Sequence, residues 1–140
     1  MNTPIEETLV LVKPDGVARN LTGEILRRIE AKGYSLVDVK LVEPDRSLLA
    51  AHYAEHAGKP FYEPLVEFME SGPIVAFRVA GNRVIEGFRA LAGTTDPTTA
   101  APGTILGDLG RDWGSKVQQN LVHGSDSPES AARELALWFD

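Results

Sequence analysis

Apolar and polar positions follow the pattern of a strand in four parts of the chain. Residues 8–13 form an apolar run that ends at Lys13, directly before the turn-forming sequence Pro-Asp-Gly. Residues 34–42 alternate as in a half-exposed strand, and residues 73–80 are nearly all apolar, as in a central strand. A last short apolar run lies at 121–122, so the pattern predicts four strands.

Apolar residues recur at helical spacing between these strands and after the last one. Candidate N-terminal caps are Thr22, Asn82 and Ser127, and a proline at the first helical position follows the last of them. The stretch between the fourth helix and the last strand shows no convincing periodic element. A connection of this length is usually functional or hides short helical turns. The predicted helices are 23–32, 47–56, 61–70, 84–92 and 128–139.

The order of the elements is strand–helix–strand, helical hairpin, strand–helix, long loop and strand–helix. This doubled βαβ order predicts an α+β fold, a ferredoxin-like sandwich with a four-stranded antiparallel sheet and helices over one face of it. A doubly wound sheet is the alternative. With 140 residues, the chain is expected to form a single domain that spans 1–140.

Composition and charge exclude several classes of function. The net charge is −6, from 14 basic and 20 acidic residues, so the chain is a poor candidate for coating nucleic acid or an anionic membrane. It has no cysteine, which excludes disulfides and thiolate metal sites. No apolar run approaches the roughly 20 residues of a membrane span, and the N-terminus lacks the regions of a signal peptide. A cytoplasmic location is therefore expected.

Taken alone, the candidate chemical residues have both functional and structural interpretations. His123 lies where a short strand meets a capped helix, a suitable place for chemistry, but it could equally be an ordinary polar loop residue. Lys13 could point at a site beyond the sheet or be a solvated strand end, and Arg89 could simply stabilise a helix C-terminus. His52 and His56 have the spacing of two metal ligands, but no third ligand is in sight, so no metal ligand is assigned.

Read together, the motifs of the chain resemble those of the nucleoside diphosphate kinase family. The resemblance runs in the same order from about residue 8 to residue 139. It implies the ferredoxin-like sandwich and the transfer of the γ-phosphoryl group of a nucleoside triphosphate, such as ATP, to a nucleoside diphosphate. The matching segments are TLVLVKPDGV, HYAEHAGKPFY, SGPIVAFRVAG, FRALAGTTDP, APGTI and NLVHGSDSPESA.

The resemblance also implies the catalytic residues. His123 would be the nucleophile and would become a phosphohistidine midway through a ping-pong cycle. Imidazole must be neutral to attack, and an unperturbed histidine is mostly neutral at pH 7. By the same analogy Glu134 orients the imidazole, and Tyr53 packs beside it. Mg²⁺ is expected to bind mainly through the nucleotide phosphates and water.

The remaining site residues implied by the resemblance bind the nucleotide. Lys13 matches the lysine that reaches the phosphates and sugar hydroxyls, and Arg89 and Thr95 match groups that bind the phosphate chain. Asn120 matches the amide that contacts the ribose 3′-hydroxyl. Phe61 matches the ring on which the base stacks, and stacking tolerates any base because every base has a π-face.

Two departures from the family pattern lie close together. The family's PGTI segment is normally followed by a phosphate-binding arginine, which is Leu106 here, and the segment 109–119 is about four residues longer than usual. Arg111 in that segment is a hypothetical substitute for the missing cation, and Lys116 is a weaker one. The resemblance further implies homo-oligomers, dimers that build tetramers or hexamers, without fixing their number.

Two other functions compete with this interpretation. One is a non-catalytic ferredoxin-like module that binds a small ligand, which would need none of the matched polar residues together. The other is a serine hydrolase that uses Ser125 or Ser127 near His123. The hydrolase lacks a nucleophile-elbow pattern, and Ser127 is better explained as a helix cap.

Overall fold

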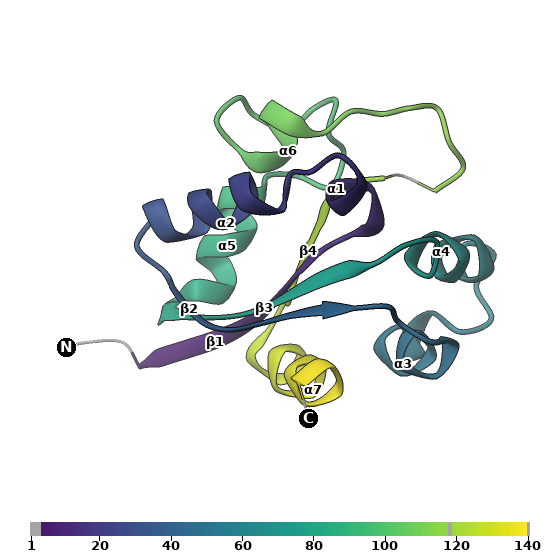
Figure 1. Ribbon diagram of the computed structural model, residues 1–140, viewed down its shortest axis with the longest axis horizontal. Coiled ribbons are helices and arrows are strands. Elements are labelled where there is room, and N and C mark those ends of the chain that lie inside the picture. Colours follow the sequence, from purple (N-terminus) through teal and green to yellow (C-terminus); the bar gives the residue numbers. More distant parts are fainter. Residues whose placement is uncertain (1–3, 118, 140) are drawn as a thin grey trace.

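The computed structural model describes residues 4–117 and 119–139, and a four-stranded antiparallel sheet forms its centre (Figure 1). The order of strands across the sheet is β2-β3-β1-β4, which is the ferredoxin-like arrangement predicted from the sequence. β1 pairs with β3 on one side and with β4 on the other. The strands are β1 (Ile5–Val12), β2 (Ser35–Val42), β3 (Ile74–Asn82) and β4 (Val122–Gly124).

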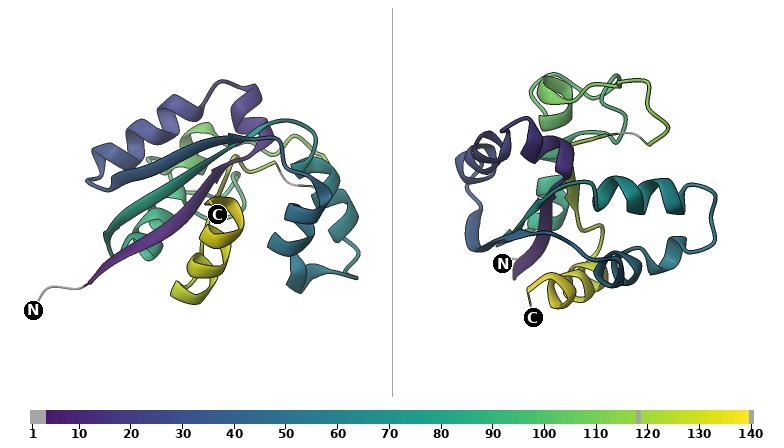
Figure 2. Two further views of the ribbon diagram at one scale, coloured as in Figure 1. Left: turned by 60° about the horizontal axis from the view of Figure 1, so that its bottom comes forward. Right: turned by 45° about the vertical axis from the view of Figure 1, so that its right-hand side comes forward.

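Helices cover both faces of the sheet (Figures 1 and 2). One face packs against α2 (Thr22–Ala31), α5 (Val84–Ala92) and the short α6 (Ile105–Leu109). The other face packs against α3 (Arg46–His52), α4 (Tyr62–Met69) and α7 (Pro128–Phe139). The expectation of helices over one face is therefore wrong.

The pattern of β1 explains why both faces are covered. Leu9 and Leu11 point into the hydrophobic cluster beneath α3, α4 and α7, whereas Val10 and Val12 point into the cluster beneath α2 and α5. All four side chains are fully buried, so each face of the central strand needs its own layer of helices.

Several local elements differ from the prediction at their ends. The Pro-Asp-Gly turn opens a short helix, α1 (Pro14–Ala18), with its proline at the first helical position. Neither Thr22 nor Asn82 is a cap: the residues at the cap positions are Leu21 for α2 and Arg83 for α5. In both cases the cap position lies one residue away from the candidate, and the residue there makes no side-chain capping hydrogen bond.

Two other predictions about helices had different outcomes. The helix predicted at 47–56 is divided at Tyr53 into α3 and a 3₁₀ turn, Ala54–His56. Ser127 caps α7 as predicted, because its hydroxyl accepts a hydrogen bond of 3.1 Å from the Ser130 amide. The cap fixes the start of the helix that carries Glu134.

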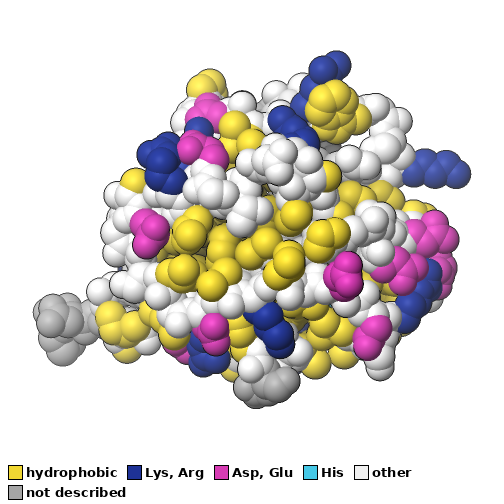
Figure 3. Space-filling view, in the orientation of Figure 1, with side chains coloured by type: hydrophobic (Ala, Val, Ile, Leu, Met, Phe, Trp, Pro, Cys, Tyr) yellow, Lys and Arg dark blue, Asp and Glu magenta, His cyan; other side chains and the backbone are white. Residues whose placement is uncertain are grey.

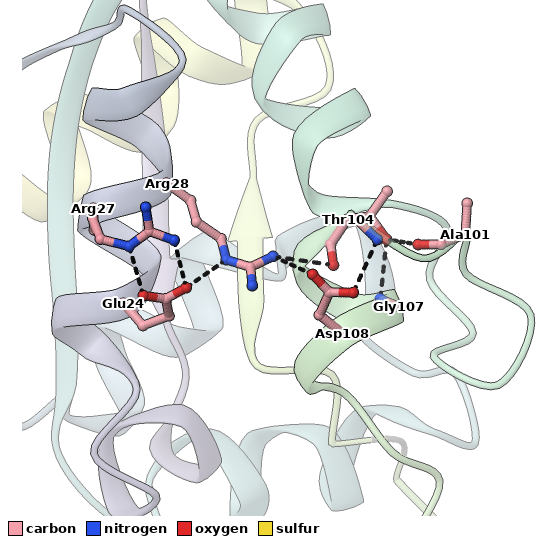
Figure 4. Close-up of polar contacts among 8 residues, drawn as sticks. Glu24, Arg27, Arg28, Ala101, Thr104, Gly107 and Asp108 are labelled. Carbon is pink, nitrogen blue, oxygen red and sulfur yellow. Dashed lines mark hydrogen bonds and ion pairs between the residues drawn. The ribbon is translucent and has the colours of Figure 1, made fainter.

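The long connection between α5 and β4 contains α6, a helical turn of the kind that its length suggested. Thr104 caps α6 by accepting a bond of 3.0 Å from the Gly107 amide. Arg28 of α2 reaches across to Asp108 of α6 at 2.8 Å, and Asp108 also accepts from the Gly103 amide (Figure 4). This network ties the connection to the first helical layer.

β2 is an edge strand with an apolar outer surface. Val37, Val39 and Leu41 are exposed by 52%, 52% and 69%. Hydrophobic side chains gather across the middle of the face seen in Figure 3. Exposed apolar side chains on a sheet edge are typical of an interaction surface. Among the described helices, none has the length and apolar character needed to cross a membrane.

Candidate active site

The catalytic candidates come together where β4 meets α7. His123 lies in β4 opposite Leu11 of β1, and its Nε2 lies 2.8 Å from Oε1 of Glu134 on α7. The buried Ser125 hydroxyl donates to the same carboxylate oxygen at 2.7 Å and accepts from the Leu9 amide at 3.2 Å. β4, the turn at Ser125 and the capped helix α7 therefore fix the position of the His123 imidazole relative to the Glu134 carboxylate.

This arrangement determines which nitrogen of His123 is free. Burial acts to raise the pKa of Glu134, but its contacts with His123 and Ser125 hold the pKa below the usual value, so the group stays ionised. An ionised carboxylate only accepts hydrogen bonds, so Nε2 of His123 carries the proton. In the neutral ring of this tautomer, Nδ1 keeps its lone pair.

A strained turn brings Asn120 to the end of β1. The Val122 amide donates to the Asn120 carbonyl at 2.6 Å, which closes a γ-turn around Leu121, and Leu121 has a positive φ of 66°. The Lys13 amide donates to the Leu121 carbonyl at 2.7 Å, and Asp15 accepts from the Leu121 amide at 3.1 Å. These bonds hold a conformation that is costly for a residue other than glycine.

The turn places the side chains of Lys13 and Asn120 in direct contact. Lys13 Nζ donates to Oδ1 of Asn120 at 2.6 Å. Burial lowers the pKa of Lys13 to about 8, against the opposing attraction of Asp15. The ammonium is still mostly charged at pH 7 and is incompletely neutralised, so it is suited to attract an anionic ligand.

Two adjoining cavities lie beside these groups. The larger, of about 450 Å³, lies between α5, α6 and β4, and Arg89, Thr95 and Asn120 contribute to its lining. The smaller, of about 190 Å³, exposes His123 and Glu134. Arg89 and Gly124 line both, and the Arg89 guanidinium donates to the Gly124 carbonyl at 3.4 Å. A phosphate chain that enters the larger cavity would therefore pass Arg89 before it reaches His123.

The structure brings six of the eight predicted residues into the lining of these cavities; Lys13, which contacts Asn120, and Phe61 line neither. Tyr53 lines the smaller cavity but packs directly on the ring of His52, with 4.6 Å between ring centroids. Phe61 lines neither cavity: its half-exposed ring packs against His56, at a centroid distance of 5.3 Å, and His56 lines the smaller one. The ring of Phe61 thus lies at the rim.

Three residues at the site were not assigned to it from the sequence. His52 is buried against His123, and Ser125 bridges β1 and Glu134. His56 lines the smaller cavity, and its Nδ1 is buried with no hydrogen-bond partner among the described residues. The sequence signal for His52 was its spacing of four residues from His56, which suggested two metal ligands on one helix. The helix ends at Tyr53, so the two histidines lie on different elements.

The structure also bears on the departures from the family pattern and on the serine hydrolase. Leu106 is buried and lines the larger cavity, so an apolar side chain stands where an arginine was expected. Arg111 is exposed and stacks on Trp113, at 4.4 Å from the ring centroid, outside the lining of both cavities. Ser125 is fully buried and donates to Glu134, and the Ser127 hydroxyl caps α7, so each hydroxyl has a structural role rather than that of a nucleophile activated by His123.

Comparison with known sequences identifies close relatives. The family model described as nucleoside diphosphate kinase matches residues 6–140. The chain is 59% identical over 135 residues to the nucleoside diphosphate kinase of Streptomyces avermitilis, with 96% of each chain covered. It is also 59% identical to the enzyme of Mycolicibacterium vanbaalenii over the same length and coverage.

Solved structures agree with the sequence comparison. A halophilic nucleoside diphosphate kinase from Halobacterium salinarum, in complex with CDP, superposes with a TM-score of 0.91 at 47% identity, covering 98% of this chain and 89% of that one. A nucleoside diphosphate kinase family protein from Babesia bovis gives a TM-score of 0.87 at 46% identity, covering 96% and 88%. The fold, the polar residues beside the two cavities and these relatives agree, and the chain belongs to the nucleoside diphosphate kinase family.

Proposed function

We propose that this phosphotransferase works through a covalent phosphohistidine on His123. Nδ1 attacks the γ-phosphorus of a nucleoside triphosphate, the bond to the bridging oxygen breaks, and the nucleoside diphosphate leaves. In the second half-reaction a β-phosphate oxygen of another diphosphate attacks the same phosphorus and the N–P bond breaks. Glu134 keeps the Nε2 proton in place through both steps and stabilises the positive charge that develops on the ring.

The same proposal assigns the neighbouring polar groups to the nucleotide. The Lys13 ammonium and the Arg89 guanidinium neutralise the phosphates, and the Thr95 hydroxyl donates to them. Asn120, held against Lys13, contacts the ribose 3′-hydroxyl. Phe61 at the rim stacks on the base, which supports broad nucleoside specificity because no base edge is read.

We propose that Mg²⁺ enters as part of the substrate, bound to the nucleotide phosphates. Mg²⁺ prefers oxygen ligands in octahedral geometry and usually keeps several waters. Among the described residues, one cluster of three potential metal ligands occurs, and two of its members are the imidazoles of His52 and His123. That donor set does not suit a resident Mg²⁺ ion. The magnesium–nucleotide complex is therefore the species that the cationic groups bind.

The observation that carries this proposal is the 2.8 Å contact between His123 Nε2 and the ionised Glu134, which leaves Nδ1 as the nitrogen with a lone pair, on a residue that lines the smaller cavity. Incubation with γ-labelled magnesium–ATP should add one phosphoryl group to the intact protein. The label should be lost in acid, survive in alkali, and be absent from His123→Ala. Label on His123→Ala, or label that is stable in acid, would reassign the nucleophile. Ser127→Ala is the matched control and should still accept label.

We propose further that Arg111 supplies the cation missing at Leu106. The support is that Arg111 lies on an exposed segment near the larger cavity's α6 wall, held by a stacking contact with Trp113 that a phosphate could replace. Arg111→Ala should then raise the KM for ATP, whereas Lys116→Ala should change it little. An unchanged KM and rate in Arg111→Ala would remove this role.

We propose that the protein is a homo-oligomer built from dimers that join through β2. The exposed apolar side chains of Val37, Val39 and Leu41 on an edge strand support this assembly. Light scattering should give at least a dimer for the natural sequence and a smaller species for Leu41→Lys. The mass measured by light scattering also distinguishes a tetramer from a hexamer.

We propose a single domain and a cytoplasmic location for this chain. Residues 1–140 form one nucleoside diphosphate kinase domain, which a single cooperative unfolding transition would support. The protein is cytoplasmic, where its nucleotide substrates are, and fractionation of cells that contain it would test this location.

A further inference from the structure

His52 is a buried histidine that the proposed reaction does not use, although its ring touches the nucleophile. The rings of His52 and His123 pack edge to face, with centroids 4.8 Å apart and an interplanar angle of 73°. His52 is 4% exposed and also contacts the rings of Tyr53 and Trp138. A polar ring this deeply buried needs a specific partner.

The partner is Trp138, on the helix that also carries Glu134. The indole Nε1–H of Trp138 donates to Nδ1 of His52 at 3.0 Å. Glu134 and Trp138 are four residues apart, so they lie on the same face of α7. Arg133 of the same helix donates to the carbonyls of Ala51 and His52, at 3.0 and 3.4 Å. α7 thus fixes both the backbone and the side chain of His52.

The tryptophan contact also determines the tautomer of His52. An indole N–H is only a donor, so Nδ1 of His52 must be unprotonated, and the neutral ring carries its proton on Nε2. Burial, followed by repulsion from His123, lowers the pKa of His52 to about 3, so the ring is neutral at working pH. Arg133 and Lys13 act in the same direction, and Glu134 opposes them.

The same tautomer argues against a metal site, the other role that this cluster suggests. His52, His123 and Glu134 offer ligand atoms that all lie within 4.8 Å of one another. A ligating imidazole nitrogen must be unprotonated, but the unprotonated nitrogen of His52 faces the Trp138 N–H. Binding a metal through Nε2 would require breaking that hydrogen bond inside the core.

We infer that His52, locked by Trp138, is a positioning residue that holds the His123 ring in the orientation needed for attack. Glu134 fixes His123 along the ring edge through Nε2, and the His52 ring blocks rotation from a second side. A neutral, immobile neighbour restricts the ring without placing a positive charge beside the nucleophile. The inference rests on His123 being the phosphorylated residue.

Two variants separate the ring contact from the tautomer lock. Trp138→Phe keeps an aromatic ring but removes the N–H, whereas His52→Asn keeps an acceptor for Trp138 but removes the imidazole ring. In both, phosphoenzyme formation at saturating ATP should slow about tenfold or more, the range found for outer groups that orient a reactive ligand. The KM for ATP should stay within about twofold in Trp138→Phe, because Trp138 lines neither cavity, whereas His52 itself lines the smaller one.

The control is Leu137→Ala, a change on the same helix and in the same hydrophobic cluster. It should lower the melting temperature while the rate of phosphoenzyme formation per folded molecule stays unchanged. A normal rate in Trp138→Phe would overturn the inference. If all three variants formed no phosphoenzyme with correctly folded protein, the role would be general packing, which would also overturn it.

A measurement on the natural sequence needs no variant and does not depend on the identity of the nucleophile. Long-range ¹⁵N–¹H NMR spectra of the full chain should show His52 as the Nε2-protonated tautomer, with no titration between pH 5 and 8. A His52 signal that titrates in this range, or a proton on Nδ1, would overturn the lock. Loss of label in His123→Ala, tested separately, decides the proposed function itself.

Discussion

Lys13 and Asn120 are separated by 107 residues in the chain, yet Lys13 Nζ donates to Asn120 Oδ1 at 2.6 Å. The end of β1 and the γ-turn at Leu121 meet at this bond. The contact couples the charge of Lys13 to the position of Asn120, two residues that we propose bind the nucleotide.

We expect the partly buried Lys13 to produce an alkaline limit to activity. Because burial lowers its pKa to about 8, the ammonium loses its proton as the pH rises through that value, and attraction for phosphates falls. A plot of kcat/KM for ATP against pH, which reports ionisations of the free enzyme, should decline with a midpoint near pH 8. In Lys13→Arg the decline should move beyond the accessible range, since guanidinium stays charged. An unchanged midpoint in that variant would assign the limit to another group.

The carboxylate of Glu134 should matter through its charge as well as its shape. In Glu134→Gln the amide can donate to Nε2 of His123, which would move the ring proton to Nδ1 and remove the attacking lone pair. Rapid-quench measurement should show phosphoenzyme formation slowed by about 10²-fold, with little change in ATP affinity. Glu129→Gln, in the exposed first turn of the same helix, is the control. Equal rates in both variants would contradict the orienting role.

The ion pair between Arg28 and Asp108 should affect binding more than chemistry. It supports the segment that carries Thr104 and Leu106, which form part of the wall of the larger cavity (Figure 4). Arg28→Ala should raise the KM for ATP about three- to tenfold, less than the ~10²-fold that misplacing a catalytic group can produce. Arg27→Ala also breaks a bond to Glu24 but does not reach Asp108, so its KM should stay normal. Similar KM values for the two variants would show that the ion pair does not support the wall.

His52 should make the fold sensitive to acid. The folded-state pKa of His52, about 3, lies below the ordinary value of 6.5. As the pH falls below about 6.5, the unfolded chain therefore binds a proton at His52, whereas the folded protein does not. Stability is therefore lost toward low pH, by about 2 kcal/mol between pH 7 and pH 5 from this group alone. Urea unfolding at both pH values should show a smaller loss in His52→Asn. A parallel loss in both proteins would contradict a neutral buried imidazole.

The sequence predicted the fold better than the limits of its elements. The continuous apolar run at 8–13 correctly indicated a buried strand. The prediction of helices over one face was wrong because Leu9 and Leu11 need cover as much as Val10 and Val12 do. Cap positions failed where backbone geometry decided them, as at Arg83, whose φ is 51°. Such conformations depend on tertiary contacts that local patterns do not contain.

The site residues that belong to a recognisable sequence motif could be predicted. Those whose position depends on contacts between distant elements could not. The resemblance gave His123 and Glu134, and the structure brings them within hydrogen-bond distance. It assigned no role to His52, whose hydrogen-bond partner is Trp138, 86 residues further along the chain. Spacing within one helix suggested a partner for His52 in His56, but the actual partner is on α7.

The burial of β1 on both faces limits how this enzyme can evolve. Every side chain from Leu9 to Val12 supports one of the two hydrophobic clusters, and the next residue is the lysine proposed to bind phosphate. Substitutions that repack either cluster would shift β1 and, with it, the ammonium of Lys13. Substitutions in these clusters are therefore expected to change thermal stability and substrate affinity together. We expect adaptation to a new temperature to occur through substitutions in the outer helices and loops instead.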